Sequence, residues 1–197
     1  MNKILVMATR NTGKATEIQN MLGAGIQLMT LADYPHIPDV VEDGATFEAN
    51  AVKKAVEIAK VLKVPVLADD SGLEVDALGG RPGVHSARYG GADLPHADKV
   101  CLLLKELEGL SDERRSARFV CVMALAWPDG RVVTRRGSIE GRIASTPSGS
   151  NGFGYDPVFY VPEKNCTTAE LPPTEKDAIS HRGQALRAML PLIQEIL

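Results

Sequence analysis

The sequence has few cysteines, no long apolar run and no excess of either charge. Its three cysteines, Cys101, Cys121 and Cys166, are widely spaced and form no CxxC pair, so neither a disulfide framework nor a zinc site is predicted. We expect buried thiols in a reducing compartment. No segment reaches the roughly 20 apolar residues that span a bilayer, and the apolar run near Met1 is too short for a signal peptide. A cytoplasmic protein with no membrane partner is therefore predicted.

The charge balance excludes a second class of protein. A formal net charge of -3 provides no bulk attraction to DNA or RNA, so no nucleic-acid partner is predicted. A local basic pocket for a small polyanion stays open. The 197 residues, 44% of them hydrophobic, suit a single domain over residues 1–197, built as two lobes that share a core.

Apolar runs alternate with turn signals in the first half of the chain. The pattern predicts strands at Ile4–Ala8 and Val64–Ala68, with a second short strand at Val40–Val41. One helix should end at Gly23 and another should begin after a Thr46 cap. A glycine-rich extended connection and a further helix should follow, over 72–93 and around Val100–Leu107.

The second half of the chain changes character. Two apolar runs flank Pro128–Gly130, which predicts a hairpin of Phe119–Trp127 with Arg131–Ser138. After a Gly/Ser-rich loop at 144–155 come a short strand, Val158–Val161, and a last helix from about Glu175, with Thr174 and Asp177 at capping-box spacing and a kink at Pro191. Helices that alternate with strands early and a hairpin later indicate an α/β protein with a mixed sheet.

A polar turn between the first strand and the first helix could bind phosphate. Free N–H groups at a helix start form an anion site, and a lysine adds a full positive charge. The residues are Thr9, Arg10, Asn11, Thr12, Gly13 and Lys14. This turn nearly matches the P-loop of ATPases and kinases, which stays an alternative. Ala15 stands where a P-loop needs Ser or Thr to bind magnesium, and the initial glycine is absent.

Adjacent carboxylates follow the second buried strand, in Asp69-Asp70-Ser71-Gly72. Two neighbouring carboxylates suggest a cation or a shared proton. On a strand they point to opposite faces, so one could hold metal while the other orients it or accepts a proton from water. Glu42 in an acidic turn offers a further metal ligand, and Lys54 could point towards phosphates.

Two later segments suggest a base-binding site. Gly152-Phe153-Gly154-Tyr155-Asp156-Pro157 sets aromatic rings between glycines; an aromatic face can stack on a base, and Asp156 could accept from ring N–H groups. Lys176 and Ser180 are four residues apart and should share a helix face with Arg182 nearby. Turns and solvated helix starts are the alternatives for both segments.

Taken together, these segments resemble the inosine/xanthosine triphosphate pyrophosphatase family, also known as the Ham1-like or non-canonical purine NTP pyrophosphatases. The resemblance covers nearly the whole chain in six ordered blocks. These are Thr9–Lys14, Glu42–Gly44 with Thr46-Phe47 and Asn50-Ala51, Ala68–Leu73, Gly79–Arg88, Gly152–Pro157, and Lys176 with Ser180-His181-Arg182.

The resemblance implies a fold and a reaction. The fold would be a long mixed β-sheet flanked by helices, in two lobes with a cleft between them, and the protein a homodimer. The enzyme would use Mg²⁺, or Mn²⁺, to cleave ITP, dITP or XTP into a monophosphate and pyrophosphate, which cleanses the nucleotide pool. The preferred base, the ribose preference and the number of metal ions stay open.

The resemblance also assigns residues. Glu42 and Asp70 would bind the metal, Asp70 would accept a proton from the attacking water, and Asp69 would support it. The expected substrate-binding residues are Thr9, Arg10, Asn11, Thr12, Gly13, Lys14, Lys54, Ser71, Phe153, Gly154, Tyr155, Asp156, Lys176, His181 and Arg182.

The sequence departs from the family pattern at one acidic position. Many relatives read Thr-Phe-x-Glu-Asn, whereas Ala49 stands here at the Glu position and Glu48 comes one residue earlier. The metal geometry is therefore left open. A P-loop phosphotransferase and a non-enzymatic nucleotide- or nucleic-acid-binding module remain the competing hypotheses.

Overall fold

A computed structural model of the chain describes residues 3–197 and contains one mixed sheet flanked by helices, in the order β2-β1-β3-β4-β5-β6-β7. The strands are β1 (Lys3–Met7), β2 (Ile26–Thr30), β3 (Val66–Val75), β4 (Ser116–Ala126), β5 (Val132–Ile143), β6 (Phe159–Val161) and β7 (Cys166–Thr167). The helices are α1 (Thr12–Leu22), α2 (Phe47–Leu62), α3 (His96–Glu106), α4 (Pro173–Ile179) and α5 (His181–Ile196).

Strand direction changes along the sheet, as the predicted mixed sheet requires. β1 runs parallel to both β2 and β3, with Met7 opposite Thr30 on one side and Leu67 on the other. β6 runs antiparallel to both β5 and β7. The predicted hairpin is present as β4 and β5, whose turn is closed by the Trp127 N–H donating to the Arg131 carbonyl.

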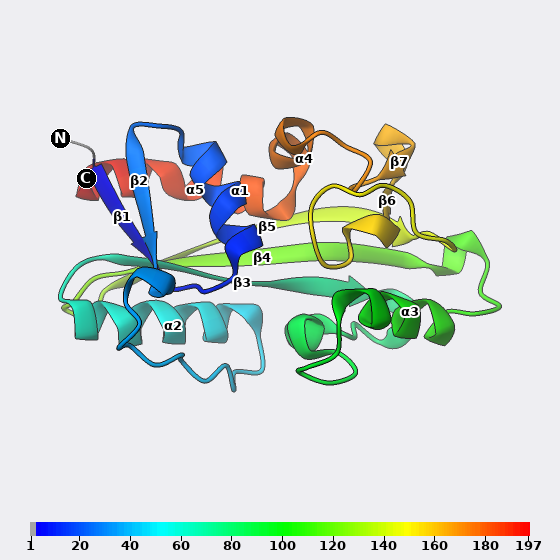
Figure 1. Cartoon of the computed structure of the whole chain (residues 1–197), viewed down its shortest axis with the longest axis horizontal. Helices are drawn as coiled ribbons and strands as arrows, with labels where there is room; N and C mark the ends of the chain where they lie inside the picture. The colour runs from blue at the N-terminus through cyan, green and yellow to red at the C-terminus, as the bar shows by residue number, and fades with distance from the viewer. Residues whose placement is uncertain (1–2) are drawn as a thin grey trace. The chain divides into compact units, whose positions relative to one another are not determined.

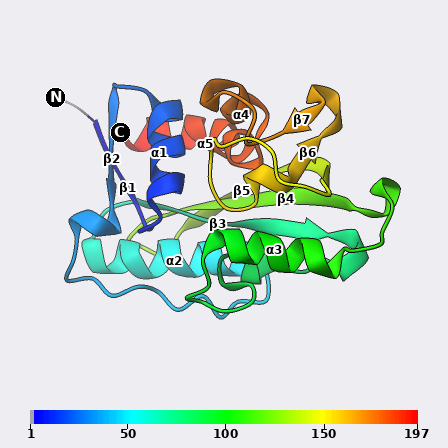
Figure 2. The same cartoon turned by 45° about the vertical axis from the view of Figure 1, so that its right-hand side comes forward.

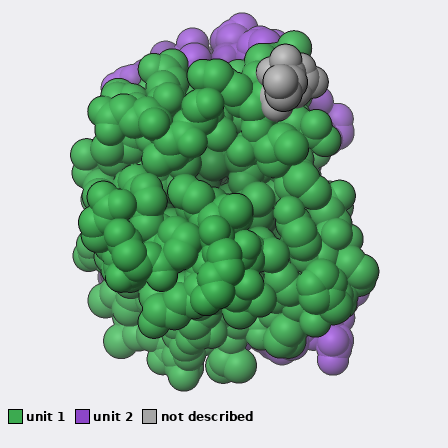
Figure 3. All heavy atoms as spheres, turned by 90° about the vertical axis from the view of Figure 1, so that its left-hand side faces the viewer, with its two compact units in different colours: residues 1–70, 121–137, 181–197 green, residues 71–120, 138–180 purple. Residues whose placement is uncertain are grey.

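The chain divides into two compact units, each with its own core. Unit 1 comprises residues 1–70, 121–137 and 181–197 (Figure 3). In this unit α1 and α5 lie on one face of the strands and α2 on the other (Figure 1). Its core is built from β1, β3, β4, α1 and α5, with the buried side chains Leu5, Met7, Ile18, Leu67, Cys121, Met123, Leu125, Ala185, Leu186, Met189 and Ile193.

Unit 2 comprises residues 71–120 and 138–180. Its α3 and α4 lie on opposite faces of the strands (Figure 2). The buried side chains are Leu73, Val75, Tyr89, Val100, Leu103, Leu107, Ala117, Phe119, Ile143, Tyr155, Val158, Phe159 and Val161. That residues 1–197 form a single domain of two lobes stays a prediction.

Several predicted elements differ from the structure. No strand forms at Val40–Val41, and β2 at Ile26–Thr30 pairs with β1 instead. The Asp69-Asp70 pair does not end its strand, because β3 continues to Val75. The predicted extended connection over 72–93 therefore begins as strand, and it continues in two short 3₁₀ turns.

The C-terminal helix is interrupted. Ser180 adopts an extended conformation that ends α4, and α5 begins at the next residue. The predicted capping box is wrong, because α4 starts at Pro173 and no side chain caps it. Pro191 lies inside α5, which runs on to Ile196.

Cysteine burial also differs from prediction. Cys121 is buried, but Cys101 is exposed and Cys166 is half-buried, and all three are free thiols. Within residues 3–197, no helix is long and apolar enough to cross a membrane.

Candidate active site

The start of α1 presents backbone donors. Asn11 caps the helix, and its side-chain oxygen accepts from the Lys14 N–H at 3.0 Å. The Thr9 hydroxyl accepts from the Asn11 N–H at 3.1 Å, which fixes the turn that follows β1. The N–H groups of Thr12 and Gly13 come before the first intrahelical hydrogen bond. This helix start therefore has the geometry of an anion site.

Arg10 is occupied by structural contacts. Its guanidinium donates to the carbonyls of Leu31 and Ile37, both at 2.6 Å, and to the carboxylate of Asp39 at 2.7 Å. These contacts hold the 31–39 segment against the turn at residues 9–14, the phosphate turn. The substrate contact expected of Arg10 stays a prediction.

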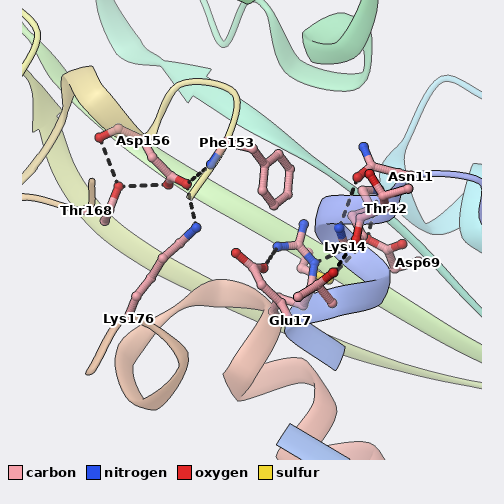
Figure 4. Close-up of polar contacts among 12 residues, drawn as sticks. Asn11, Thr12, Lys14, Glu17, Asp69, Phe153, Asp156, Thr168 and Lys176 are labelled. Carbon is pink, nitrogen blue, oxygen red and sulfur yellow. Dashed lines mark hydrogen bonds and ion pairs between the residues drawn. The ribbon is translucent and has the colours of Figure 1, made fainter. Parts of the chain in front are cut away.

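Asp69 is a buried carboxylate that is surrounded by cations. It is 1% exposed, and the Lys14 ammonium lies 2.9 Å from it (Figure 4). The Arg182 guanidinium lies 3.8 Å from it. Burial alone would raise the pKa of Asp69, but the charges of Lys14, Arg182 and Lys54 outweigh burial and hold this pKa well below its usual range. Asp69 is therefore ionised and holds Lys14 beside the helix start.

Asp70 has a different environment. The Asn50 amide donates to it at 2.9 Å, while the Asn50 carbonyl oxygen accepts from the Gly44 N–H at 2.8 Å. Burial raises the pKa of Asp70 despite the opposing charge of Lys54, and the nearby Glu42 carboxylate raises it further. A carboxyl group with a raised pKa is suited to accept a proton.

Asn50 was not among the predicted site residues. It is fully buried on α2 and connects the 42–44 turn to Asp70. The sequence signal was a lone amide between Phe47 and Ala51 on an otherwise apolar helix face, where a buried polar group needs partners.

The acidic residues of unit 1 fit a divalent cation. Lys54 forms an ion pair with Glu42, and the charges of Asp69, Glu42 and Asp70 raise the Lys54 pKa against the effect of burial. The carboxylates thus already attract one cation. In the described part of the chain, no group of three or more His, Cys, Asp or Glu side chains could hold a metal alone. Magnesium commonly needs only one or two carboxylates beside substrate phosphates, and Glu42 with Asp70 meets that need.

Arg182 lies on α5 in unit 1, whereas Lys176 lies on α4 in unit 2. The prediction that Lys176, Ser180 and Arg182 lie on the first turns of one helix is wrong, because α4 ends before Ser180 and α5 begins after it. Arg182 is 2% exposed, forms a short ion pair with Glu17 and faces Asp69. Glu17 was not predicted, and only its place one turn after the phosphate turn could have indicated it.

The aromatic loop, residues 152–157, carries the second cluster, which lies in unit 2. Asp156 is its centre: the Lys176 ammonium donates to it at 2.5 Å, the Phe153 N–H at 2.8 Å and the Thr168 hydroxyl at 2.8 Å (Figure 4). The Lys176 nitrogen also lies 5.2 Å from the centre of the Phe153 ring, a cation–π distance. The loop thus presents an aromatic ring beside a buried ion pair.

Glycine is required within this loop. Gly152 has φ +74°, and a Cβ there would lie 2.1 Å from an Asp156 carboxylate oxygen and 2.9 Å from the Lys176 nitrogen. Gly154 has φ +65° with open space around it. The absence of a Cβ at Gly152 leaves room for the ion pair between Asp156 and Lys176.

The remaining predicted residues are placed as follows. Tyr155 is 5% exposed and its ring packs in the unit 2 core, so its side chain does not face solvent as a substrate contact would. Ser71 is half-buried in β3, and His181 is buried at the start of α5. Glu48 accepts from the Thr134 hydroxyl at 2.8 Å.

Comparisons with known proteins agree with this architecture. The Ham1 family profile matches residues 5–192. A Geobacillus kaustophilus protein named dITP/XTP pyrophosphatase is 50% identical over 99% of this chain and 96% of its own length. The solved HAM1 protein of Coxiella burnetii is 44% identical with a TM-score of 0.87 over 99% of this chain and all of its own. The Staphylococcus aureus Ham1 structure is 38% identical with a TM-score of 0.86, over 98% and 99% of the two chains. With profile, sequence and structure in agreement over nearly its full length, the chain belongs to the Ham1 family.

Proposed function

We propose that this protein hydrolyses non-canonical purine nucleoside triphosphates, namely ITP, dITP and XTP, to the monophosphate and pyrophosphate. The observation that carries the proposal is the contact between the phosphate turn and the carboxylates of β3, where Lys14 lies 2.9 Å from Asp69. A polyanion site and a proton-accepting carboxyl group are thereby adjacent within unit 1. The name of the Geobacillus kaustophilus relative supports the same reaction.

The phosphate chain is held by α1. The N–H groups of Thr12 and Gly13 and the ammonium of Lys14 donate to phosphate oxygens, and the helix dipole adds to the attraction. Asp69 keeps Lys14 in place before substrate arrives. These contacts to the phosphate chain are the same whichever base the nucleotide carries.

Glu42 and Asp70 would hold Mg²⁺, and Mn²⁺ has the same oxygen preference. The bound ion would neutralise charge on the phosphate oxygens as the bond breaks. Lys54, paired with Glu42, would then be free to turn towards a phosphate.

Asp70 accepts a proton from the attacking water. The water oxygen forms a bond to the α-phosphorus, the bond from that phosphorus to the bridging oxygen breaks, and pyrophosphate leaves with that oxygen. Asn50 holds the Asp70 carboxyl group in position at 2.9 Å. Asp69 stays ionised throughout, because Lys14 and Arg182 hold its pKa low against the effect of burial.

The base is bound by the cluster in unit 2. Phe153 offers a face for stacking, Lys176 donates to the 6-oxo oxygen that hypoxanthine and xanthine share, and Asp156 accepts from ring N–H groups. An adenine amino group would offer Lys176 no acceptor oxygen at the 6-position, and a polar site rejects a mismatched base through such a missing contact. We also propose a homodimer, on the resemblance to the family.

The reaction is tested with ITP and Mg²⁺ in ¹⁸O-labelled water. We expect pyrophosphate as product and the label in the inosine monophosphate, since water attacks the α-phosphorus. Label in the pyrophosphate would place the attack on the β-phosphorus and remove the assigned step. Release of orthophosphate alone, or a phosphorylated acceptor, would favour a phosphotransferase; binding without turnover would favour a binding module.

A further inference from the structure

Tyr155 lies between the base-binding residues Phe153 and Asp156, yet its side chain points into the core. Its ring packs among the buried residues of unit 2, and its hydroxyl donates to the backbone carbonyl of Ser86 at 3.0 Å. Burial raises the pKa of this phenol, so it stays protonated and keeps its donor. The aromatic loop is thus attached to a segment 69 residues earlier in the chain.

Ser86 is itself firmly held. It is 6% exposed, its hydroxyl accepts from the Leu73 N–H at 2.8 Å, and the same hydroxyl donates to the Gly83 carbonyl at 2.7 Å. Leu73 belongs to the buried part of β3. The carbonyl that meets Tyr155 therefore belongs to a residue that is fixed to a central strand.

A second contact holds the next residue of this 3₁₀ turn, η3 (Gly83–Arg88). The ammonium of Lys99, from α3, donates to the Ala87 carbonyl at 2.6 Å, and the Lys99 side chain is 3% exposed. A buried ammonium that loses its acceptor is costly, so this contact resists movement of η3. Tyr155 is consequently hydrogen-bonded to a turn, η3, that has little freedom to move.

We propose that Tyr155 and Ser86 are positioning residues that set the place of Phe153 and Asp156 for the base. The inference rests on the proposed function, since it concerns the same base-binding loop. Asp156 anchors the loop through Lys176 and Thr168, and Tyr155 anchors it from the core side. Two anchors on neighbouring residues fix both the position and the tilt of the Phe153 peptide.

The test removes single hydroxyl groups. Tyr155→Phe deletes the donor and keeps the ring in the core. Because one hydrogen bond is lost, the KM for ITP should rise about 3- to 10-fold. The value of kcat should change less than about two-fold, since no group that acts on the α-phosphate belongs to this loop.

A matched control is available in the same core. Tyr89 is buried among the same residues, and its hydroxyl donates at 2.7 Å to the carboxylate of Glu106, a residue of α3 and not of the aromatic loop. Tyr89→Phe therefore removes an equivalent group without loosening the loop, and its KM should stay at the wild-type value. An equal rise in KM for Tyr89→Phe and Tyr155→Phe would reduce the role of Tyr155 to general stability and overturn the proposal.

Ser86→Ala should reproduce part of the effect, because the carbonyl that Tyr155 meets is then less firmly held. The double variant Ser86→Ala/Tyr155→Phe should raise KM less than the product of the two single effects, as expected for residues in one chain of contacts. Fully multiplicative effects would show that Ser86 and Tyr155 act separately, against the proposal.

Amide hydrogen exchange in the substrate-free protein separates this inference from the proposed function. Tyr155→Phe should speed exchange within residues 152–157, and Tyr89→Phe should not. Unchanged exchange in Tyr155→Phe would overturn the positioning role even if ITP is hydrolysed. Absence of ITP turnover by the wild type, with faster exchange in Tyr155→Phe, would refute the proposed function and leave the attachment of the loop supported.

Discussion

Two neighbouring carboxyl groups on β3 have opposite tendencies to ionise. Asp69 and Asp70 point to opposite faces of the strand, so each meets different partners. Asp69 meets Lys14 and Arg182, which lower its pKa against the effect of burial, whereas burial dominates at Asp70 and raises its pKa. The divergence supports the proposed roles, in which Asp69 holds cations and Asp70 accepts a proton.

The first prediction concerns Asp70→Asn. Turnover of ITP should fall by about 10²- to 10⁴-fold or more, because the proton acceptor is lost. Stability should rise at neutral pH: the folded-state pKa of Asp70 lies above its ordinary value of 3.8, so ionisation of the wild-type residue weakens the fold as pH rises through that pKa. The gain should vanish below about pH 3.8, where the wild-type carboxyl is protonated in both states.

Melting temperatures of the substrate-free protein at several pH values measure this effect. Asp76→Asn is the control, because Asp76 is an exposed carboxylate whose pKa is lowered by its hydrogen bonds to Ser116 and Arg118. It should keep full turnover and gain no stability at neutral pH. Near-normal turnover in Asp70→Asn would remove Asp70 from the mechanism.

The second prediction concerns Arg182→Ala. It leaves Glu17 and Asp69 buried with one cation fewer, so the free energy of unfolding should fall by about 3–5 kcal/mol. Urea denaturation measures the change. Arg187→Ala, an exposed position on the same helix, should stay within about 0.5 kcal/mol of wild type. If Arg182→Ala kept wild-type stability but lost discrimination between bases, Arg182 would contact the base and would not be needed for the stability of unit 1.

At the scale of elements, the aromatic loop depends on glycine at one position more than at another. Both Gly152 and Gly154 have positive φ, but only at Gly152 would a Cβ collide, with the Asp156 carboxylate at 2.1 Å. Gly154→Ala should therefore cost about 1 kcal/mol of backbone strain.

The third prediction is that Gly152→Ala costs about 3 kcal/mol, because a collision adds to the strain. It should also raise the KM for ITP at least about ten-fold, since the Asp156–Lys176 pair must shift. Denaturation curves and steady-state kinetics on both variants separate strain from collision. Equal losses at the two glycines would mean that the Asp156–Lys176 pair does not depend on this close approach.

Elements with strong local signals could be predicted from the sequence. The Thr46 cap, the apolar face of α2 and the Pro128–Gly130 turn each depend on neighbouring residues, and each is present. β2 was missed, because its alternation is weak and its pairing with β1 is decided by long-range contacts. The break at Ser180 was missed for a similar reason, since the 175–196 sequence has helical spacing throughout.

The site residues also divide into those marked by a local sequence signal and those that depend on long-range contacts. Lys14, Asp69 and Asp70 could be predicted as candidates because motif and strand pattern mark them, and the structure brings Lys14 within 2.9 Å of Asp69. Asn50 and Glu17 were not predicted, since their importance comes from partners that are 20 and 165 residues away in sequence. The distance in sequence between interacting residues, more than the chemistry of their side chains, limited the prediction of the site.

On the scale of the whole molecule, removal of the metal ion should abolish turnover without unfolding the protein. Lys54 already neutralises Glu42 without a metal ion. The fourth prediction is that a chelator abolishes ITP turnover while the melting temperature of the substrate-free protein changes by less than about 2 °C. Calorimetry with and without EDTA, followed by Mg²⁺ add-back, provides the measurement. Turnover that survives chelation would contradict the metal assignment.

The proposed function predicts one substrate profile. The proposed contacts to the phosphate chain are common to all nucleoside triphosphates, so the choice between substrates is expected to depend on contacts to the base. That dependence can be measured only on the complete protein with complete nucleotides.

The most direct test is therefore a panel of kcat/KM values for ITP, XTP, dITP, GTP and ATP with Mg²⁺, with pyrophosphate identified as product. We predict that ITP, dITP and XTP are hydrolysed at least about 100-fold more efficiently than ATP, because the 6-amino group of ATP offers Lys176 no acceptor oxygen. Equal efficiency for ATP and ITP would contradict the account.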